Sequence, residues 1–149
     1  MTIAPVVVEV EVPLDPQAAF ALFTEQVGTW WPLETHSVFG RDAVDVRFPA
    51  CADGPIVEVS SAGEESTWGT VQQFDPPALV RFTWHPGRLP DTAQEVEVAF
   101  TPTSRGTAVR LVHTGWEAAG GRAAEIRDDY ATGWVGVLDR FTAAVPVRR

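Results

Sequence analysis

The C-terminal segment Gly121–Val145 is the only long stretch of this sequence whose apolar residues recur with the period of an α-helix. At about 1.5 Å per residue it would form a helix roughly 37 Å long. A helix with a single apolar face needs an apolar surface of similar length to cover it. The rest of the chain must therefore supply that surface. The expected face comprises Ala123, Ile126, Tyr130, Trp134, Val137, Leu138, Phe141 and Val145.

Composition limits both the size of the core and the class of partner. A chain of 149 residues is expected to form a single domain, 1–149, that buries about 70% of its unfolded surface without a disulfide or structural metal. The 20 acidic and 11 basic side chains give a net charge of −9, which argues against binding to nucleic acid or to an anionic membrane. Because every basic residue is arginine, Schiff-base chemistry on a lysine is excluded.

The single cysteine and the N-terminus bear on localisation. Cys51 lies in a turn-like context and has no cysteine partner in the chain, so no intrachain disulfide can form. An ordinary loop cysteine is the simpler reading, and a nucleophilic thiol is the alternative. The first 12 residues alternate instead of showing the basic start and apolar run of a signal peptide, and no stretch approaches the ~18 apolar residues of a membrane span. We expect a soluble, cytoplasmic protein.

The segment before the long helix has the pattern of an antiparallel sheet. Alternation over residues 6–12 predicts a first strand. Asp15 before Pro16 predicts the start of a short helix that ends near Gly28, and a proline-broken aromatic loop, 29–40, follows it. Short breakers then separate six further expected strands, so that neighbours pair as a meander. These strands are expected over residues 44–48, 55–61, 66–74, 78–85, 94–100 and 107–116.

This order of elements predicts an α+β helix-grip architecture. Seven antiparallel strands would form one curved sheet that wraps around the long C-terminal helix, with two short helices after the first strand. Where the helix and the sheet diverge, a cavity is expected. Tryptophan is unusually frequent for this length, with 6 residues. Each indole either fills the core or lines that cavity, where aromatic walls with a few polar groups are typical of small-molecule sites.

Short motifs spread over about residues 5–145 resemble the START-like domains of the SRPBCC superfamily, also called birch-pollen-allergen-like. Among these the sequence is most similar to the homologues of the activator of the ninety-kilodalton heat-shock-protein ATPase. The resemblance implies the helix-grip fold, but it does not specify one function, because this fold hosts lipid carriers, hormone receptors, cyclases and co-chaperone domains. The motifs are Trp30-Trp31-Pro32, His36-Ser37, Trp68-Gly69, Asp75-Pro76-Pro77, Val96-Glu97-Val98, His113-Thr114-Gly115-Trp116 and Gly133-Trp134.

Two histidines are candidates for the cavity. His113 shares a strand face with Val109 and Leu111, which extends the apolar row toward one end of the sheet. It can be a hydrogen-bonded core residue, a donor to a ligand, or a catalytic base. His36 lies in the aromatic loop and either covers the same cavity or is satisfied within the loop.

Two charged residues have an ambiguous direction. Alternation does not decide whether Glu58 faces in or out, because its neighbours on both faces are apolar; the resemblance implies an inward carboxylate, which then needs donors or a cation. Arg127 interrupts the apolar face of the long helix. It either extends its guanidinium to the rim or pairs across the cavity with Glu58 or with a ligand carboxylate. A metal site formed by His36, Glu58 and His113 has no supporting spacing, so we expect no metal and no cofactor.

The function expected from this sequence is binding of a small, mostly apolar or aromatic ligand between the long helix and the sheet. A polyketide cyclase or aromatase-like enzyme, assisted by His or Arg, is one alternative, although no strong catalytic dyad is present. A chaperone-associated interaction domain is the other, and a homodimer is left open. The residues expected to contact the ligand are Trp31, His36, Glu58, Trp68, Trp84, His113, Arg127, Tyr130 and Trp134.

Overall fold

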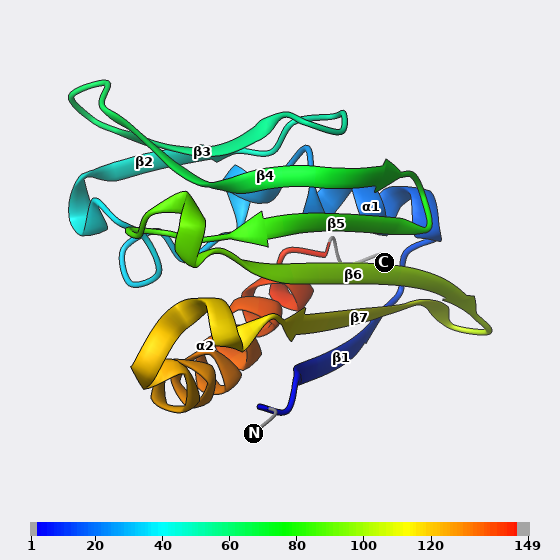
Figure 1. Cartoon of the computed structure of the whole chain (residues 1–149). Coiled ribbons are helices and arrows are strands. Elements are labelled where there is room, and N and C mark those ends of the chain that lie inside the picture. Colours follow the sequence, from blue (N-terminus) through cyan, green and yellow to red (C-terminus); the bar gives the residue numbers. More distant parts are fainter. Residues whose placement is uncertain (1–2, 146–149) are drawn as a thin grey trace.

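A computed structural model describes residues 3–145 and confirms the helix-grip architecture (Figure 1). Seven antiparallel strands form one sheet in the order β1-β7-β6-β5-β4-β3-β2. The six later strands are the predicted meander, and β1 pairs with β7 to complete the sheet. The strands are β1 (Val6–Val12), β2 (Ala43–Arg47), β3 (Pro55–Ser60), β4 (Glu65–Asp75), β5 (Leu79–Trp84), β6 (Gln94–Thr103) and β7 (Gly106–Thr114).

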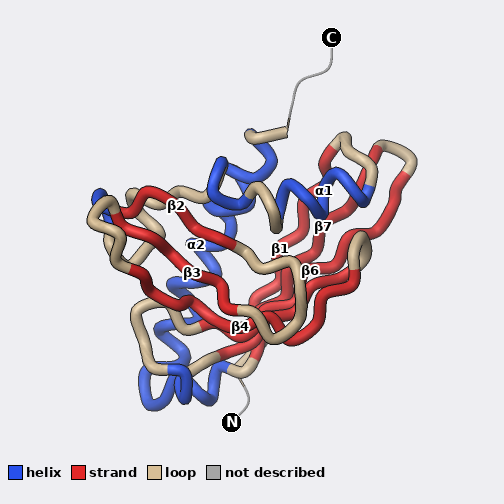
Figure 2. Tube along the Cα trace, turned by 90° about the horizontal axis from the view of Figure 1, so that it is seen from above, coloured by secondary structure: helices blue, strands red, loops and turns tan. Residues whose placement is uncertain are grey.

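Two α-helices lie on the same side of this sheet. Viewed from above, the strands trace a curve with α1 and α2 between its arms (Figure 2). Short 3-10 turns complete the connections, and the first of them follows α1, as the sequence predicts two short helices after the first strand. The helices are α1 (Pro16–Phe23) and α2 (Ala123–Ala143), and the turns are η1 (Val27–Thr29), η2 (Gly40–Asp42), η3 (Pro90–Thr92) and η4 (Trp116–Arg122). None of the helices in this described range is long and apolar enough to cross a bilayer.

The start of α1 is set by its own sequence. The Asp15 side chain caps the helix by accepting a hydrogen bond from the Ala18 amide at 2.7 Å, and Pro16 occupies the first turn. The apolar face of α2 is also the predicted one, because Trp134, Val137, Leu138 and Phe141 are all buried. This helix begins two residues later than Gly121, since η4 and a left-handed Gly120 (φ 84°) precede it.

Aromatic rings fill the space between the sheet and the helices. Trp31 lies at the centre, with ring centroids 5.1 Å from Trp68, 5.9 Å from Trp84 and 5.9 Å from Trp134. The void beside this cluster, between Trp31, Trp68 and Phe82, measures about 10 Å³, which at most holds one water. The interior is therefore packed, and the open space lies at one end of the aromatic cluster.

Candidate functional site

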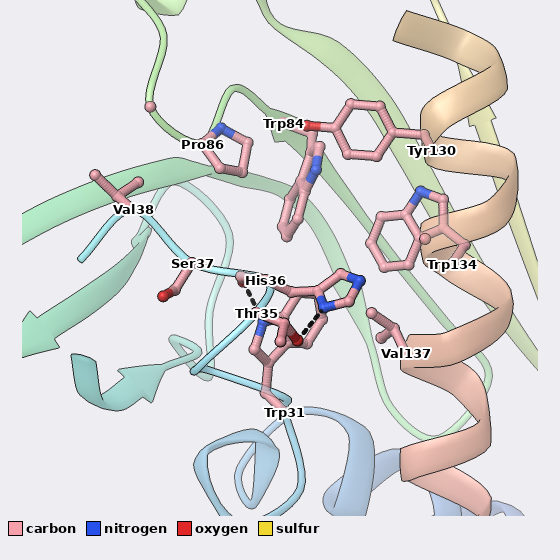
Figure 3. A pocket seen from close by; sticks show the side chains of 12 residues that line it. Trp31, Thr35, His36, Ser37, Val38, Trp84, Pro86, Tyr130, Trp134 and Val137 are labelled. Atoms are coloured by element: carbon pink, nitrogen blue, oxygen red, sulfur yellow. Dashed lines mark hydrogen bonds between the residues drawn. The ribbon is translucent and has the colours of Figure 1, made fainter. Parts of the chain in front are cut away.

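A pocket of about 390 Å³ opens between the middle of α2, the segment that follows β5 and the loop before η2 (Figure 3). This volume lies within the range of about 300–1,000 Å³ that small-molecule sites occupy. The walls are mainly aromatic and aliphatic, and hydroxyl and imidazole groups lie among them. The lining residues are Trp31, Thr35, His36, Ser37, Val38, Trp84, Pro86, Gly87, Tyr130, Gly133, Trp134 and Val137.

Five of the predicted ligand contacts meet at this pocket although they come from three separate segments. Trp31 and His36 come from the aromatic loop, Trp84 ends β5, and Tyr130 and Trp134 lie on α2. Figure 3 shows these side chains gathered around one space. Their contact with a ligand stays a prediction. Four other predicted contacts, Glu58, Trp68, His113 and Arg127, do not line the pocket.

The loop that forms one wall is held in place by hydrogen bonds to its backbone. The Trp31 indole donates to the His36 carbonyl at 2.8 Å, and the Ser37 hydroxyl donates to the Leu33 carbonyl. The Thr35 hydroxyl lies 2.7 Å from Nδ1 of His36 (Figure 3). The other ring nitrogen of His36, Nε2, faces α2, and a Cβ added to Gly133 would lie 3.8 Å from it. The imidazole therefore lies between the loop and α2 at the exposed side of the pocket.

Glu58 faces inward and supports that loop from behind. Its carboxylate is fully buried and accepts three hydrogen bonds, from the Val38 and Phe39 amides at 2.8 Å and from the Trp68 indole at 2.7 Å. Alternation left its direction open, and the structure confirms the inward register. Three donors satisfy a buried carboxylate without a cation. Glu58 thus positions the pocket wall, and Trp68 completes that support.

Replacement of this carboxylate by an amide tests its role. In Glu58→Gln, both side-chain oxygens cannot remain acceptors, so the new NH₂ group must face a Val38, Phe39 or Trp68 donor. We expect the free energy of unfolding to fall by about 1–3 kcal/mol, and the Val38 and Phe39 amides to exchange hydrogen faster. Urea unfolding and hydrogen exchange measure both effects. Glu64→Gln, an equal charge change at an exposed position, is the control; equal losses in the two variants would contradict this role.

His113 is a hydrogen-bonded core residue, the first of its three alternatives, and it does not line the pocket. Its side chain is fully buried and stacks on Trp116 at a centroid distance of 3.9 Å. Nδ1 accepts from the Trp134 indole at 2.9 Å, so Nε2 carries the proton and donates to Gln94 Oε1 at 3.2 Å. Burial lowers the pKa of His113 from 6.5 to about 3. Both nitrogens are occupied, so this imidazole cannot serve as a base at the pocket.

Arg127 does not pair with Glu58 and does not reach the pocket. Its guanidinium donates to the Ala4 and Pro5 carbonyls, each at 3.1 Å, and to Asp128 at 3.2 Å. The side chain is 28% exposed. The rim alternative is therefore the correct one, and Arg127 ties α2 to the chain just before β1.

His36, Glu58 and His113 do not meet as metal ligands. Glu58 accepts from three protein donors, and both ring nitrogens of His113 are engaged by Trp134 and Gln94. Within residues 3–145, no group of three or more His, Cys, Asp or Glu side chains lies close enough to hold a metal ion.

Sequence reasoning missed part of the site. The sequence indicates only a break between strands at Pro86 and Gly87, yet both line the pocket, and a Cβ on Gly87 would lie 3.7 Å from Val38. Gln94 was also missed, although period-two alternation with Val96 and Val98 places it on the inward face, where it binds His113. A polar residue at an inward strand position was the available signal.

The hydroxyl of Tyr130 lies at the Trp84 end of the pocket (Figure 3). Burial raises the pKa of Tyr130 above 10.0, while the Trp84 indole and the Arg88 charge oppose that rise. The hydroxyl is therefore protonated at neutral pH and can donate a hydrogen bond. Trp84 Nε1 is buried, and its approach to Tyr130 does not meet hydrogen-bond geometry, so it has no partner among the described residues.

Solved structures share this fold at low sequence identity. Protein BH1534 of Bacillus halodurans is 20% identical with a TM-score of 0.70, and the match covers 98% of this chain and 100% of that one. MLL2253 of Mesorhizobium loti is 16% identical with a TM-score of 0.70, covering 94% and 95%. The AHSA1-like protein of Aeromonas hydrophila is 18% identical with a TM-score of 0.66, covering 94% and 90%. Among curated proteins, none matches this sequence.

The sequence itself decides the family. Three of the motifs that resemble activators of the heat-shock ATPase contribute side chains to the pocket walls, through Trp31, His36 and Trp134. The family model described as Activator of Hsp90 ATPase homolog 1-like protein matches residues 13–146. The chain therefore belongs to this family, as its motifs predict.

Proposed function

We propose that this protein binds a small, mostly apolar or aromatic molecule in the pocket between α2, the end of β5 and the aromatic loop. The observation that carries the proposal is a space of about 390 Å³ walled by aromatic side chains, beside a packed cluster whose own void measures about 10 Å³. Apolar ligands gain free energy from such walls in proportion to the area they bury.

The walls that would hold the ligand are already packed and hydrogen-bonded by the protein itself. Trp31, Trp84 and Trp134 are each less than 9% exposed, and they pack against one another. The loop wall is fixed by Glu58 and by the Trp31 indole. A preorganised site loses little conformational entropy on binding, which favours affinity.

The chemistry of the lining favours binding over catalysis. Among the described residues, the lining contains a single imidazole, His36, and no carboxylate. The other titratable side chain in that lining is Tyr130, whose hydroxyl keeps its proton at neutral pH and so does not act as a base. With His113 in the core, the cyclase alternative loses one of its candidate bases.

One glycine provides a sharp test of the pocket. Gly133 lines it, and a Cβ there has ordinary contact distance only to His36. Gly133→Leu should therefore leave the fold intact while its side chain fills the pocket or displaces His36. Gly136→Leu makes the same change on the same helix at a site with no atom within 4 Å, and it is the matched control.

We expect the two variants to differ in binding and agree in stability. A panel of aromatic acids, flavonoids and lipids is screened by thermal shift and tryptophan quenching. For any ligand found, Gly133→Leu should weaken binding at least about 10-fold, the cost of roughly 1.4 kcal/mol, and Gly136→Leu should not. Both should raise the free energy of unfolding slightly, since leucine favours helix over glycine by up to about 1 kcal/mol. Unchanged binding in Gly133→Leu would place the ligand elsewhere.

Interaction with a chaperone ATPase is the alternative that the family name suggests. A pull-down with and without nucleotide tests it. If Gly133→Leu leaves chaperone capture unchanged while no panel compound binds wild-type protein, the interaction function replaces the ligand-binding proposal.

A further inference from the structure

The six tryptophans differ in how their indole N–H groups are satisfied. Five donate within the protein at 2.7–3.1 Å, to a backbone carbonyl, to Glu58 or to His113. The sixth, Trp84, is 4% exposed, lines the pocket and has no partner among residues 3–145. A buried donor without a partner is unfavourable, so such groups usually mark a strained or functional position.

The Tyr130 hydroxyl lies beside Trp84 at the pocket wall (Figure 3). Within the described chain the hydroxyl makes no hydrogen bond that meets geometric limits, and its proton is retained at neutral pH. Two neutral donors, the indole N–H and the phenol O–H, therefore lie together at one end of an apolar pocket. The charge of Arg88 also acts on this hydroxyl and favours electron-rich groups near it.

We infer that the ligand is an aromatic molecule carrying an acceptor oxygen, a carbonyl or a carboxylate, that receives the Tyr130 hydroxyl proton as a hydrogen bond at the Trp84 end of the pocket. Trp84 then faces the Tyr130 oxygen and acts as a positioning residue. This inference rests on the proposed function. It adds which chemical group the pocket selects, since the buried, unpartnered Trp84 indole beside the Tyr130 hydroxyl disfavours a ligand that brings no acceptor to this end of the pocket.

Shape-matched ligands separate the acceptor oxygen from the apolar body. 2-Acetylnaphthalene and 2-ethylnaphthalene differ by one carbonyl oxygen, and 2-naphthoate replaces the ketone by an anion. Calorimetric titration of wild-type protein should show 2-acetylnaphthalene binding at least about fivefold more tightly than 2-ethylnaphthalene, as expected of one hydrogen bond. In Tyr130→Phe, which removes only the hydroxyl, this ratio should fall to about 1–2 while the affinity for 2-ethylnaphthalene stays within about twofold.

Two further comparisons identify which kind of oxygen is bound and keep the test valid if one variant fails to fold. Tighter binding of 2-naphthoate than of the ketone, lost in Arg88→Gln or at high salt, assigns a carboxylate, whereas equal binding assigns a carbonyl. Trp84→Phe should also reduce the ratio, and if that variant fails to fold, Tyr130→Phe still decides. Equal affinities of wild type for the ketone and the hydrocarbon overturn the inference. Failure of all three compounds to bind also overturns it, whereas the proposed function is judged separately by Gly133→Leu on whichever panel ligand binds.

Discussion

Replacing Gly69 by alanine is expected to lower the free energy of unfolding by at least about 3 kcal/mol. Gly69 lies within β4, and a Cβ there would be 1.7 Å from the Thr83 carbonyl oxygen and 2.6 Å from its carbonyl carbon. Both are backbone atoms of β5, so no side-chain rotation can relieve the clash. The two strands would have to separate.

That separation would break specific bonds between β4 and β5. Beside Gly69, the His85 amide donates to the Trp68 carbonyl at 2.6 Å, and the Thr70 amide donates to the Thr83 hydroxyl at 2.8 Å. Trp68 and Trp84, which flank this crossing, belong to the aromatic cluster under the pocket. Loss of the close approach would therefore also loosen one pocket wall.

Urea unfolding followed by circular dichroism measures the Gly69→Ala effect. Gly136→Ala is the control, because an added Cβ there meets nothing within 4 Å in an exposed helix position; it should be stabilised by up to about 1 kcal/mol. The same substitution thus has opposite signs at the two glycines. A Gly69→Ala variant as stable as wild type would show that β4 and β5 do not approach this closely.

Replacing His113 by phenylalanine is expected to cost about 2–4 kcal/mol at pH 7.5. The ring shape is kept, but the buried Trp134 indole loses its acceptor and Gln94 loses its donor. Two buried polar groups are then unsatisfied. The stacking partner Trp116 is retained, so the loss reports mainly on the hydrogen bonds.

The same variant should change how stability depends on pH. Because burial lowers the pKa of His113 to about 3 in the folded state, only the unfolded protein takes up this proton between about pH 6.5 and 3. Folded wild-type protein therefore loses stability as pH falls through this window. From pH 7.5 to 5 the loss from this one group is about 2 kcal/mol. His113→Phe lacks it, so the difference in unfolding free energy between the two proteins should shrink by that amount.

Urea unfolding of both proteins at pH 7.5, 6.5, 5.5 and 5.0 tests this convergence. Carboxylates that titrate in the same range act equally in both proteins and cancel in the difference. Nuclear magnetic resonance gives an independent check, since the ring of folded His113 should keep its Nε2–H tautomer at pH 5. A constant difference across this pH range, or a ring that titrates near 6.5, would contradict the buried neutral imidazole.

Local patterns in the sequence were sufficient for most of the fold. Three signals depend only on residues that are close together in the chain. They are the period of α2, the alternation of the six meander strands and the Asp15-Pro16 start of α1. Such signals are readable because a helix or strand face depends only on spacing. The order of these elements predicted the helix-grip arrangement, which the structure confirms, and the resemblance to heat-shock ATPase activators predicted the family, which the family match confirms.

The candidate site could be predicted only in part, for a physical reason that individual residues illustrate. Alternation placed His113 on the inward face correctly, but its partners come from α2 and β6, which occupy both ring nitrogens. Arg127 was correctly identified as a charge on an apolar face, yet its acceptors are carbonyls 122 and 123 positions away in the chain. Neither set of hydrogen bonds can be predicted from the residues that neighbour His113 or Arg127 in the sequence.

The sequence by itself determined the elements, the apolar faces and the richness in tryptophan that makes an aromatic core unavoidable. Only the tertiary structure decided that this core is filled beneath the sheet and open at one end, where Tyr130, Trp84 and His36 converge from three segments. A face is fixed by the spacing of neighbours along the chain, whereas a cavity is the space left after distant segments have packed. Its position therefore depends on the sum of contacts that no single segment contains.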